Sequence, residues 1–407
     1  MQICIHRKLI GTERHLIHSK IENSYTWSSH IPEDAWLFGK SEKFLNSLDT
    51  IISALGLDIS LFPGDGHIKA WENLGKNRDN VMWSYALPGG MFQDYVSLLL
   101  DQLWCVLDGI NDTYYTQEFL VGRNLILNLK RASIDRKKYD KFVSDSKNTR
   151  GLRSIKTFLP ESDGFTKEII YSQTSSVTGR LTVKSGPSIL TAKKETRSVI
   201  KSRHPRGIVA QIDFKSLEPR ILLLSQGRPA GNDIYVDILN NALKGTTTRE
   251  VAKKATLGSI FGMSAKKFKT VAGIPEENSR TILRDVRKYF GISGIGKQLH
   301  DEYQENGFIS NIYGRKIFPS SGERHVLINN KIQSSGVDVA LIGFYKLMRK
   351  FKEISNEISP LFLVHDAIII DFPEDDLEKI KEITSLGVRI PGLSGTFPLS
   401  FEILNNT

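Results

Sequence analysis

The sequence predicts a mixed α and β (α+β) fold, because it contains patterns typical of buried strands, of two strands joined by a tight turn and of amphipathic helices. Residues 207–224 combine a short apolar run that suits a buried strand with a second run that suits a buried helix. Residues 361–373 place two apolar runs on either side of a polar pair, which is typical of two strands joined by a tight turn. Between these stretches, residues 248–262 repeat with helical spacing, which predicts a helix.

Each of the two strand-bearing stretches carries an aspartate at a strand end. Asp213 follows the apolar run of the first stretch, and Asp366 lies with His365 in the predicted turn of the second. An Asp after a strand is more often a helix cap or a turn residue. The second Asp changes that balance, because two carboxylates offer hard oxygen ligands that can share Mg²⁺ ions. Such paired ions stabilise the attacking and leaving oxygens in phosphoryl transfer.

Composition indicates the class of protein and the class of partner. Of the 407 residues, 40% are hydrophobic, which is enough for a large core and two or more lobes. The net charge of +10 favours a polyanionic partner, although many basic proteins only have solvated basic faces. The two cysteines, Cys4 and Cys105, offer neither a disulfide framework nor zinc-ligand spacing. No apolar run approaches a membrane span and the N-terminus lacks a signal core, so we expect a soluble, cytoplasmic protein.

The predicted helix at 248–262 carries a stripe of four residues spaced four apart, Arg249, Lys253, Leu257 and Phe261. The stripe is cationic in its N-terminal half and apolar in its C-terminal half. A nucleoside triphosphate has the matching polarity, with phosphates for the two cations and a flat base for the two apolar residues. An amphipathic helix with two cations reaching into solvent explains the spacing equally well.

Other polar residues suit a nucleic acid but also have local explanations. Arg180 follows a glycine, which allows a close approach to a minor groove; a turn arginine without a partner is the alternative. Asn329 and Gln333 share a helix face and can donate to minor-groove acceptors, or can be surface amides. Glu218, on the first turn of a predicted helix, is explained by the helix dipole alone. The basic residues of 131–141 can contact phosphates, and a solvated helix face explains them as well.

Six short motifs occur together in the order and spacing of one known family. They are TGRL at 178–181, DFKSLEPRI at 213–221, R-x-x-x-K-x-x-x-L-G-x-x-F-G at 249–262, GFISNIYGRK at 307–316, INNKIQ at 328–333 and VHD at 364–366. Together they resemble family A DNA polymerases, the bacterial DNA polymerase I type, over about residues 170–372. A fainter similarity extends through the helical segment 111–141. One such match is weak, but six collinear matches are strong.

The resemblance implies a right-hand polymerase fold with an antiparallel palm sheet, helical fingers and a reduced helical thumb. The expected parts are an N-terminal region of unassigned role at 1–110, a thumb-like segment at 111–170, the palm at 171–229 and 301–407, and the fingers at 230–300. The short thumb implies a weak grip on duplex DNA and low processivity, unless the N-terminal region or a replisome partner compensates. The N-terminal region is too short for the family's proofreading domain and lacks an Asp-x-Glu pair, so we expect no 3′ to 5′ exonuclease activity.

The resemblance also implies roles for individual residues. Two Mg²⁺ ions, which Mn²⁺ can replace, would be held by Asp213, Asp366 and the carbonyl of Phe214. Arg249 and Lys253 would bind the incoming triphosphate, and Lys253 would act as a general acid towards the departing pyrophosphate. The other residues implied at the nucleotide are Glu218, as a steric gate against a 2′-hydroxyl, and Leu257, Phe261 and Tyr235. Those implied at the primer end and the nascent minor groove are Arg180, Arg315, Asn329, Gln333 and His365.

Four positions depart from the family's usual residues. Leu257 and Phe261 stand where Phe and Tyr are usual, which weakens base stacking and removes a phenolic hydroxyl that could bond Glu218. We therefore expect relaxed discrimination against ribonucleotides. Tyr235 stands where a phosphate-contacting His is usual, and Ala367 replaces an acidic residue after the His-Asp pair.

The expected activity is extension of a primer 3′ end with deoxynucleoside triphosphates on primer-template DNA, in replication or repair. The small size and the missing proofreading domain suggest a phage or mobile-element enzyme. A single-subunit RNA polymerase shares the Asp, Lys and His-Asp elements, but TGRL and Glu218 argue against it. A non-catalytic nucleic-acid-binding protein is disfavoured because Asp213, Asp366, Arg249 and Lys253 are all present.

Overall fold

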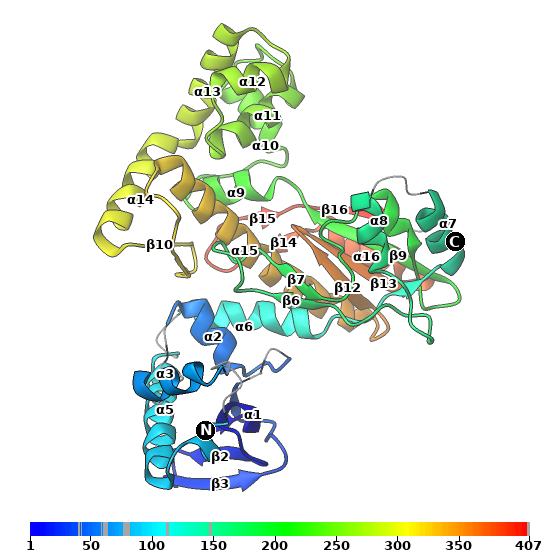
Figure 1. Ribbon diagram of the computed structural model, residues 1–407. Helices are drawn as coiled ribbons and strands as arrows, with labels where there is room; N and C mark the ends of the chain where they lie inside the picture. Colours follow the sequence, from blue (N-terminus) through cyan, green and yellow to red (C-terminus); the bar gives the residue numbers. More distant parts are fainter. Residues whose placement is uncertain are drawn as a thin grey trace. The chain divides into compact units, whose positions relative to one another are not determined.

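The computed structural model describes residues 1–39, 41, 43–57, 59, 64–75, 82–110, 114–145 and 149–404. The chain forms two compact units, Met1–Leu120 and Val121–Thr407, which are described separately (Figure 1). The division falls at Leu120, whereas the predicted boundary between the N-terminal region and the thumb-like segment lies at 110. Among the described residues, no helix combines the length and apolar character needed to cross a membrane.

The N-terminal unit contains a small mixed sheet with helices. Its strands are β1 (Gln2–Ile5), β2 (His15–Ser19), β3 (Ser24–Ser28) and β4 (Trp36–Phe38), in the order β3-β2-β1-β4. Its helices are α1 (Arg7–Ile10), α2 (Leu48–Leu55), α3 (Asp65–Asn73), α4 (Trp83–Ala86) and α5 (Gly89–Ile110). Strand β1 pairs antiparallel with β2 and parallel with β4. Trp104 of α5 donates its indole N–H to His18 Nδ1 of β2 at 2.9 Å, so helix and sheet share a buried hydrogen bond.

The second unit is built on the antiparallel sheet that the sequence predicts. Its strands are β9 (Gly207–Phe214), β12 (Ser359–Val364), β13 (Ala367–Pro373) and β16 (Leu399–Ile403), in the order β12-β13-β9-β16. All three pairings are antiparallel, and nearly every residue of β9, β12 and β13 is buried. Because both faces of the central strands β9 and β13 are buried, their residues are mostly apolar rather than alternating, with Gln211, Asp213 and Asp371 as the polar exceptions.

Helix α15 (Arg324–Ile354) confirms the long helix expected at 323–351 and packs against the sheet. The ring of Phe214 lies 5.0 Å from that of Phe344 on this helix. A Cβ at Gly343 would lie 2.6 Å from the Phe214 ring, so only glycine allows helix and sheet to approach this closely. Helix α9 (Leu217–Leu224) packs against α15, and α16 (Leu377–Ser385) packs against β16. The small strands β14 (Val388–Arg389) and β15 (Thr396–Phe397) pair with each other, and β14 contacts α15.

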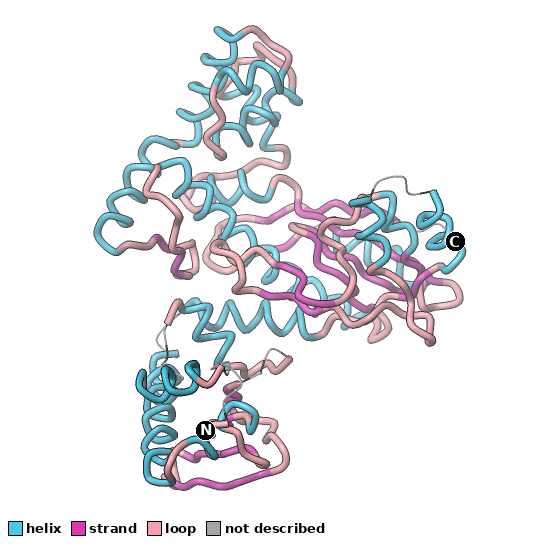
Figure 2. The backbone as a smooth tube through the Cα atoms, in the orientation of Figure 1, coloured by secondary structure: helices cyan, strands magenta, loops and turns pink. Residues whose placement is uncertain are grey.

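The insertion between β9 and β12 is helical, as expected. It contains α10 (Ile234–Asn241), α11 (Arg249–Ile260), α12 (Ala265–Ala272), α13 (Glu276–Phe290) and α14 (Ile292–Asn306). Helix α11 starts where Thr248 accepts a hydrogen bond from the amide of Val251, which confirms the helix predicted at 248–262. Figure 2 shows this region as helix and loop up to the short pair β10 (Ile309–Ser310) and β11 (Lys316–Ile317), which encloses the predicted turn at Tyr313 and Gly314.

The segment expected to be thumb-like holds short helices and strand pairs rather than one long helix. Its elements are α6 (Tyr114–Leu127), β5 (Ser133–Ile134), α7 (Arg136–Asp145) and α8 (Thr149–Lys156), followed by β6 (Ile170–Ser172), β7 (Thr182–Ser185), the 3₁₀ turn η2 (Glu195–Val199) and β8 (Ile200–Lys201). Two cations of its basic run already have carboxylate partners. Arg131 contacts Glu161 and Asp163, and Arg136 contacts Asp140. Both arginines are thus held by local ion pairs.

Candidate active site

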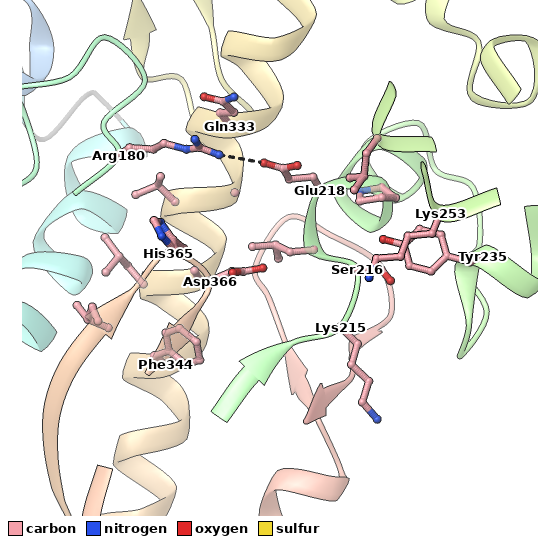
Figure 3. Close-up of a pocket in the computed structure, with 18 of the residues that line it drawn as sticks. Arg180, Lys215, Ser216, Glu218, Tyr235, Lys253, Gln333, Phe344, His365 and Asp366 are labelled. Atoms are coloured by element: carbon pink, nitrogen blue, oxygen red, sulfur yellow. Dashed lines mark hydrogen bonds and ion pairs between the residues drawn. The ribbon is translucent and has the colours of Figure 1, made fainter. Parts of the chain in front are cut away.

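A cavity of about 650 Å³ brings together most of the residues singled out in the sequence. It lies at the end of the sheet, where the β12–β13 turn, α9, α11 and α15 meet (Figure 3). The predicted residues that line it are Arg180, Glu218, Tyr235, Arg249, Lys253, Leu257, Gln333, His365 and Asp366. The lining does not include Asp213, Phe214, Phe261, Arg315 or Asn329, whose positions are given below.

The two aspartates are held at neighbouring points of the sheet. Asp213 is paired with Ala367 on β13, and Asp366 immediately precedes Ala367 in the turn. The turn requires a left-handed backbone at His365, where φ is 57°. The amide of Phe214 donates to the carbonyl of Asp366 at 3.1 Å, which fastens the end of β9 to the turn. The sheet thus places two carboxylates from residues 213 and 366 side by side.

The electrostatics of this pair fit a cation. Burial, reinforced by the negative charge of Asp366, raises the pKa of Asp213 to about 7. Burial also raises the pKa of Asp366. Within the described part of the chain, Oδ1 of Asp213 is buried and accepts no hydrogen bond. A hard cation such as Mg²⁺ would satisfy this oxygen and offset the repulsion between the two carboxylates.

The fit rests on two side chains and on backbone oxygen. The described residues contain no cluster of three or more His, Cys, Asp or Glu side chains arranged around one point. The ring of Phe214 belongs to the core, between Phe344 and Phe397. The role of the Phe214 backbone carbonyl as a metal ligand stays a prediction.

Glu218 lies on the first turn of α9, inside the cavity. Ser216, with φ of 56°, turns the chain sharply between Asp213 and this helix. Burial raises the pKa of Glu218, and Arg180 acts in the opposite direction. Arg180 Nη2 lies 3.4 Å from Glu218 Oε1, and Figure 3 shows this pair above His365 and Asp366. Burial also lowers the pKa of His365, which favours its neutral form.

Helix α11 presents the predicted cationic stripe to the cavity. Arg249, Lys253 and Leu257 all line it, and residues on the opposite side of the helix, such as Ala252 and Ala255, are buried. Phe261, which ends the stripe at the C-cap of α11, is 36% exposed. The stripe is therefore an open face of the helix, which both explanations of its spacing predict.

Three residues in this region, Asp233, Ser216 and Arg197, make contacts that were not identified from the sequence. Asp233 caps α10 and also holds the Arg249 guanidinium at 2.7 Å. The guanidinium lies 5.4 Å from the centre of the Tyr235 ring. Burial raises the pKa of Tyr235, against the smaller effects of a hydrogen bond with Ser216 and of the Arg249 charge. The polar residues before the helix at 234–241 were the available signal for this N-cap.

A third missed group is Arg197, close to Asp213. Its Nη1 donates to Gln211 Oε1 at 2.7 Å, and residues 211 and 213 share a face of β9. The positive charge of Arg197 acts to lower the pKa of Asp213, but burial and Asp366 outweigh it.

The remaining residues expected at DNA differ in exposure. Gln333 lines the cavity and donates to Asn329 Oδ1 at 2.5 Å, so the two amides do share a face of α15. Arg315 is only 5% exposed and donates to the carbonyl of Gln173 at 3.2 Å. A Cβ at Gly179 would overlap the Arg315 guanidinium, so the glycine of the TGRL motif makes room for this arginine. In this structure Arg315 supports the loop that carries Arg180.

Comparisons with known proteins point to one family. The sequence model of DNA polymerase family A matches residues 154–389. The thermostable DNA polymerase I of Thermus filiformis is 23% identical over 52% of this chain and 29% of its own length. The DNA polymerase of Mycobacterium phage D29 is 25% identical over 48% of this chain and 34% of its own length. This chain therefore corresponds to only about a quarter to a third of the length of these curated relatives.

A solved structure extends the likeness in fold. The polymerase domain of Pol1 from M. smegmatis, in complex with DNA primer-template and dNTP, superimposes with a TM-score of 0.66 at 12% identity. The match covers 99% of this chain and 94% of that domain. Since the family model covers more than half of the chain, the protein belongs to DNA polymerase family A.

Proposed function

We propose that this protein is a template-directed DNA polymerase that extends a primer 3′ end with deoxynucleoside triphosphates. The observation that carries the proposal is one cavity lined by Asp366 at its sheet end and by the cations Arg249 and Lys253 on its helical side. Asp213 lies outside the lining, at the strand end that pairs next to Asp366, and both carboxylates have a raised pKa. Two bound Mg²⁺ ions would supply an activated primer hydroxyl and a stabilised leaving group. Asp213, Asp366 and the Phe214 carbonyl would hold these ions, and Mn²⁺ would substitute for them.

The helical side would bind and orient the nucleotide. Arg249 and Lys253 would take the triphosphate, since guanidinium and ammonium groups suit phosphate oxygens. Lys253 would also deliver a proton to the departing pyrophosphate. Leu257 and Phe261 would cover the base, and Glu218 would occupy the space in which a 2′-hydroxyl would lie.

DNA would enter along the opposite wall of the cavity. Arg180, Gln333 and His365 line that wall, and Asn329 is bonded to Gln333. We propose that their donors contact the primer end and the minor groove of the newest base pairs, where acceptors occur in every sequence. Arg315 would act by holding the Arg180 loop in place.

We further propose that this chain has no proofreading activity. A 3′ to 5′ exonuclease of the two-metal kind needs carboxylates gathered at one site. The strands β1 to β4 of the N-terminal unit carry no Asp or Glu. Acidic residues outnumber basic ones in residues 1–120, so a processivity partner is a better match for this unit than a DNA backbone.

Primer extension tests the proposed function directly. A labelled primer on a DNA template should be extended with Mg²⁺ and deoxynucleotides by the wild-type protein, and not by Asp213→Asn or Asp366→Asn. Both variants should still bind the duplex, which separates lost chemistry from lost folding. Extension that survives in both variants would place the chemistry elsewhere. Degradation of a mismatched primer by pure wild-type protein would refute the proposed lack of proofreading.

A further inference from the structure

A second hollow of about 650 Å³ lies on the helical insertion, outside the cavity already described. Its lining includes the four cations Arg280, Arg284, Arg287 and Lys288 and no carboxylate. Helix α13 supplies all four, and the first turn of α14 supplies Ile292, Ser293 and Gly294. We call this feature the α13 groove. Figure 1 shows α13 beside α12 and leading into α14.

The charge of the groove follows from the spacing of α13. Residues 280, 284 and 288 are four apart and share one face, while Ile282, Val286 and Phe290 turn into the core. Arg280 pairs with Glu276 at 2.8 Å and Arg284 with Asp285 at 3.0 Å, yet both side chains are 72% exposed. Exposed pairs of this kind are weak, so both arginines can exchange their partners for a phosphate.

The groove is joined to the active-site helix by a fixed contact. Arg287 Nη2 donates to the carbonyl of Met263 at 2.6 Å, two residues beyond the exposed Phe261 at the end of α11. Ala265, at the start of α12, lines the groove. The path from the nucleotide-facing stripe of α11 to the α13 groove is therefore only a few residues long.

We propose that the α13 groove binds the sugar-phosphate backbone of single-stranded DNA, namely the unpaired template ahead of the active site. This inference rests on the proposed polymerase function. The groove has cations for phosphates and no aromatic side chain to stack on a base, so it contacts the backbone without reading sequence. A Cβ at Gly294 would meet nothing within 4 Å, which leaves space for the sugars.

The test compares two DNA probes by fluorescence anisotropy, without metal or nucleotide. One probe is a primer-template with a 12-nucleotide 5′ template overhang, and the other is the same duplex with a blunt end. The variant is Arg280→Gln/Arg284→Gln/Lys288→Gln, which leaves Arg287 and its bond to Met263 intact. The control is Arg206→Gln, because Arg206 is equally exposed and ion-paired, to Glu374 at 3.0 Å, but lies next to the end of β9 that is remote from Asp213.

We expect the triple variant to bind the overhang probe about tenfold more weakly and the blunt probe as the wild type does. The slope of log affinity against log salt should fall by about 2 for the overhang probe, since each neutralised phosphate contributes about 0.7 on a single strand. Arg206→Gln should change neither value.

Three outcomes would overturn the inference. Unchanged overhang binding would exclude the groove, and an equal loss on both probes would show only a general effect of charge. A third titration, with a labelled deoxynucleoside triphosphate alone, separates the two phosphate sources. If the variant loses nucleotide binding but keeps overhang binding, the groove is a nucleotide site and the inference is wrong. Because these readouts involve no catalysis, failure of the polymerase activity would be seen separately, in primer extension.

Discussion

The amide of Phe214 donates to the carbonyl of Asp366 at 3.1 Å, and this bond joins two segments that lie 152 residues apart in the chain. It fixes the end of β9 against the β12–β13 turn, so that the side chain of Asp213 lies beside Asp366. The adjacent residues in the sequence do not raise these pKa values: Phe214 acts to lower the pKa of Asp213, and His365 acts to lower that of Asp366. Their raised pKa values come from burial and, for Asp213, from the adjacent charge.

Asp213→Asn should therefore stabilise the metal-free protein. The pKa of Asp213 is about 7 in the folded state, above its value in an unfolded chain. The folded state then binds more protons between these two values, so this group lowers stability as the pH rises from about 4 to 7. With a discount for partial exposure, we expect the free energy of unfolding to rise by roughly 2 to 4 kcal/mol at pH 8 in the variant.

Chemical denaturation of the wild type and the variant, in EDTA, measures this difference. The gain at pH 5 should be less than half of the gain at pH 8, because the wild-type carboxyl is then largely protonated in the folded state. Added Mg²⁺ should stabilise the wild type more than the variant. Equal stability of the two proteins at pH 8 would show that Asp213 is not held in an unfavourable charged form.

Replacement of Asp371, on the neighbouring strand β13, should destabilise the protein, whereas replacement of Asp213 should stabilise it. Asp371 is fully buried and accepts from Ser202 Oγ at 2.5 Å, from the Arg203 amide at 3.0 Å and from Arg203 Nε at 3.1 Å. Asp371→Asn leaves the Arg203 charge without its partner and should cost about 3 kcal/mol in unfolding free energy. Glu374→Gln, which breaks the exposed pair with Arg206, should cost less than about 0.5 kcal/mol. A loss for Glu374→Gln as large as that for Asp371→Asn would contradict this.

The contrast between these two aspartates shows what the sequence could and could not predict. Strands, turns and the helix at 248–262 follow local periodicity, and the structure confirms them. Asp213 and Asp366 were found because each stands at the end of an apolar run. Asp371 stands inside a similar run, and nothing local tells that Ser202 and Arg203 would satisfy it from 168 or more residues away.

The contacts between side chains around the cavity likewise could not be predicted from the sequence. The stripe of α11 was predicted from spacing, but its pairing with Asp233 depends on how α10 packs beside α11. Arg315 was expected at the minor groove, whereas the close approach of Gly179 encloses its guanidinium. The cations of α13 were not predicted to form a site, because charges spaced four apart are also typical of a solvated helix face.

Asp233→Asn should tighten the binding of nucleotide. The variant keeps an oxygen for the amides of Tyr235 and Val236, so the cap of α10 is retained, but it loses the charge that holds Arg249 at 2.7 Å. If Arg249 binds the triphosphate as proposed, the triphosphate has to displace this carboxylate. Exposed ion pairs contribute up to about 1 kcal/mol, so the KM for deoxynucleotide should fall by about two- to fivefold with little change in kcat. A rise in KM in steady-state primer extension would mean instead that Asp233 positions Arg249 for the nucleotide.

Phe261→Tyr should sharpen the choice of sugar. Phe261 ends the stripe of α11 and is partly exposed, while Glu218 lies in the cavity below with its pKa raised by burial. If both residues meet the nucleotide as proposed, a hydroxyl on this ring would donate to Glu218 and hold the carboxylate against the 2′ position. A hydrogen bond to a charged group contributes about 1.5 kcal/mol, so the preference for deoxy- over ribonucleotides should rise by about tenfold.

Competition between the two nucleotides in single-turnover extension measures the ratio. Phe318→Tyr, at a more exposed phenylalanine outside the cavity lining, should leave the ratio unchanged. A wild-type ratio that already equals that of Phe261→Tyr would show that this hydroxyl has no part in sugar selection.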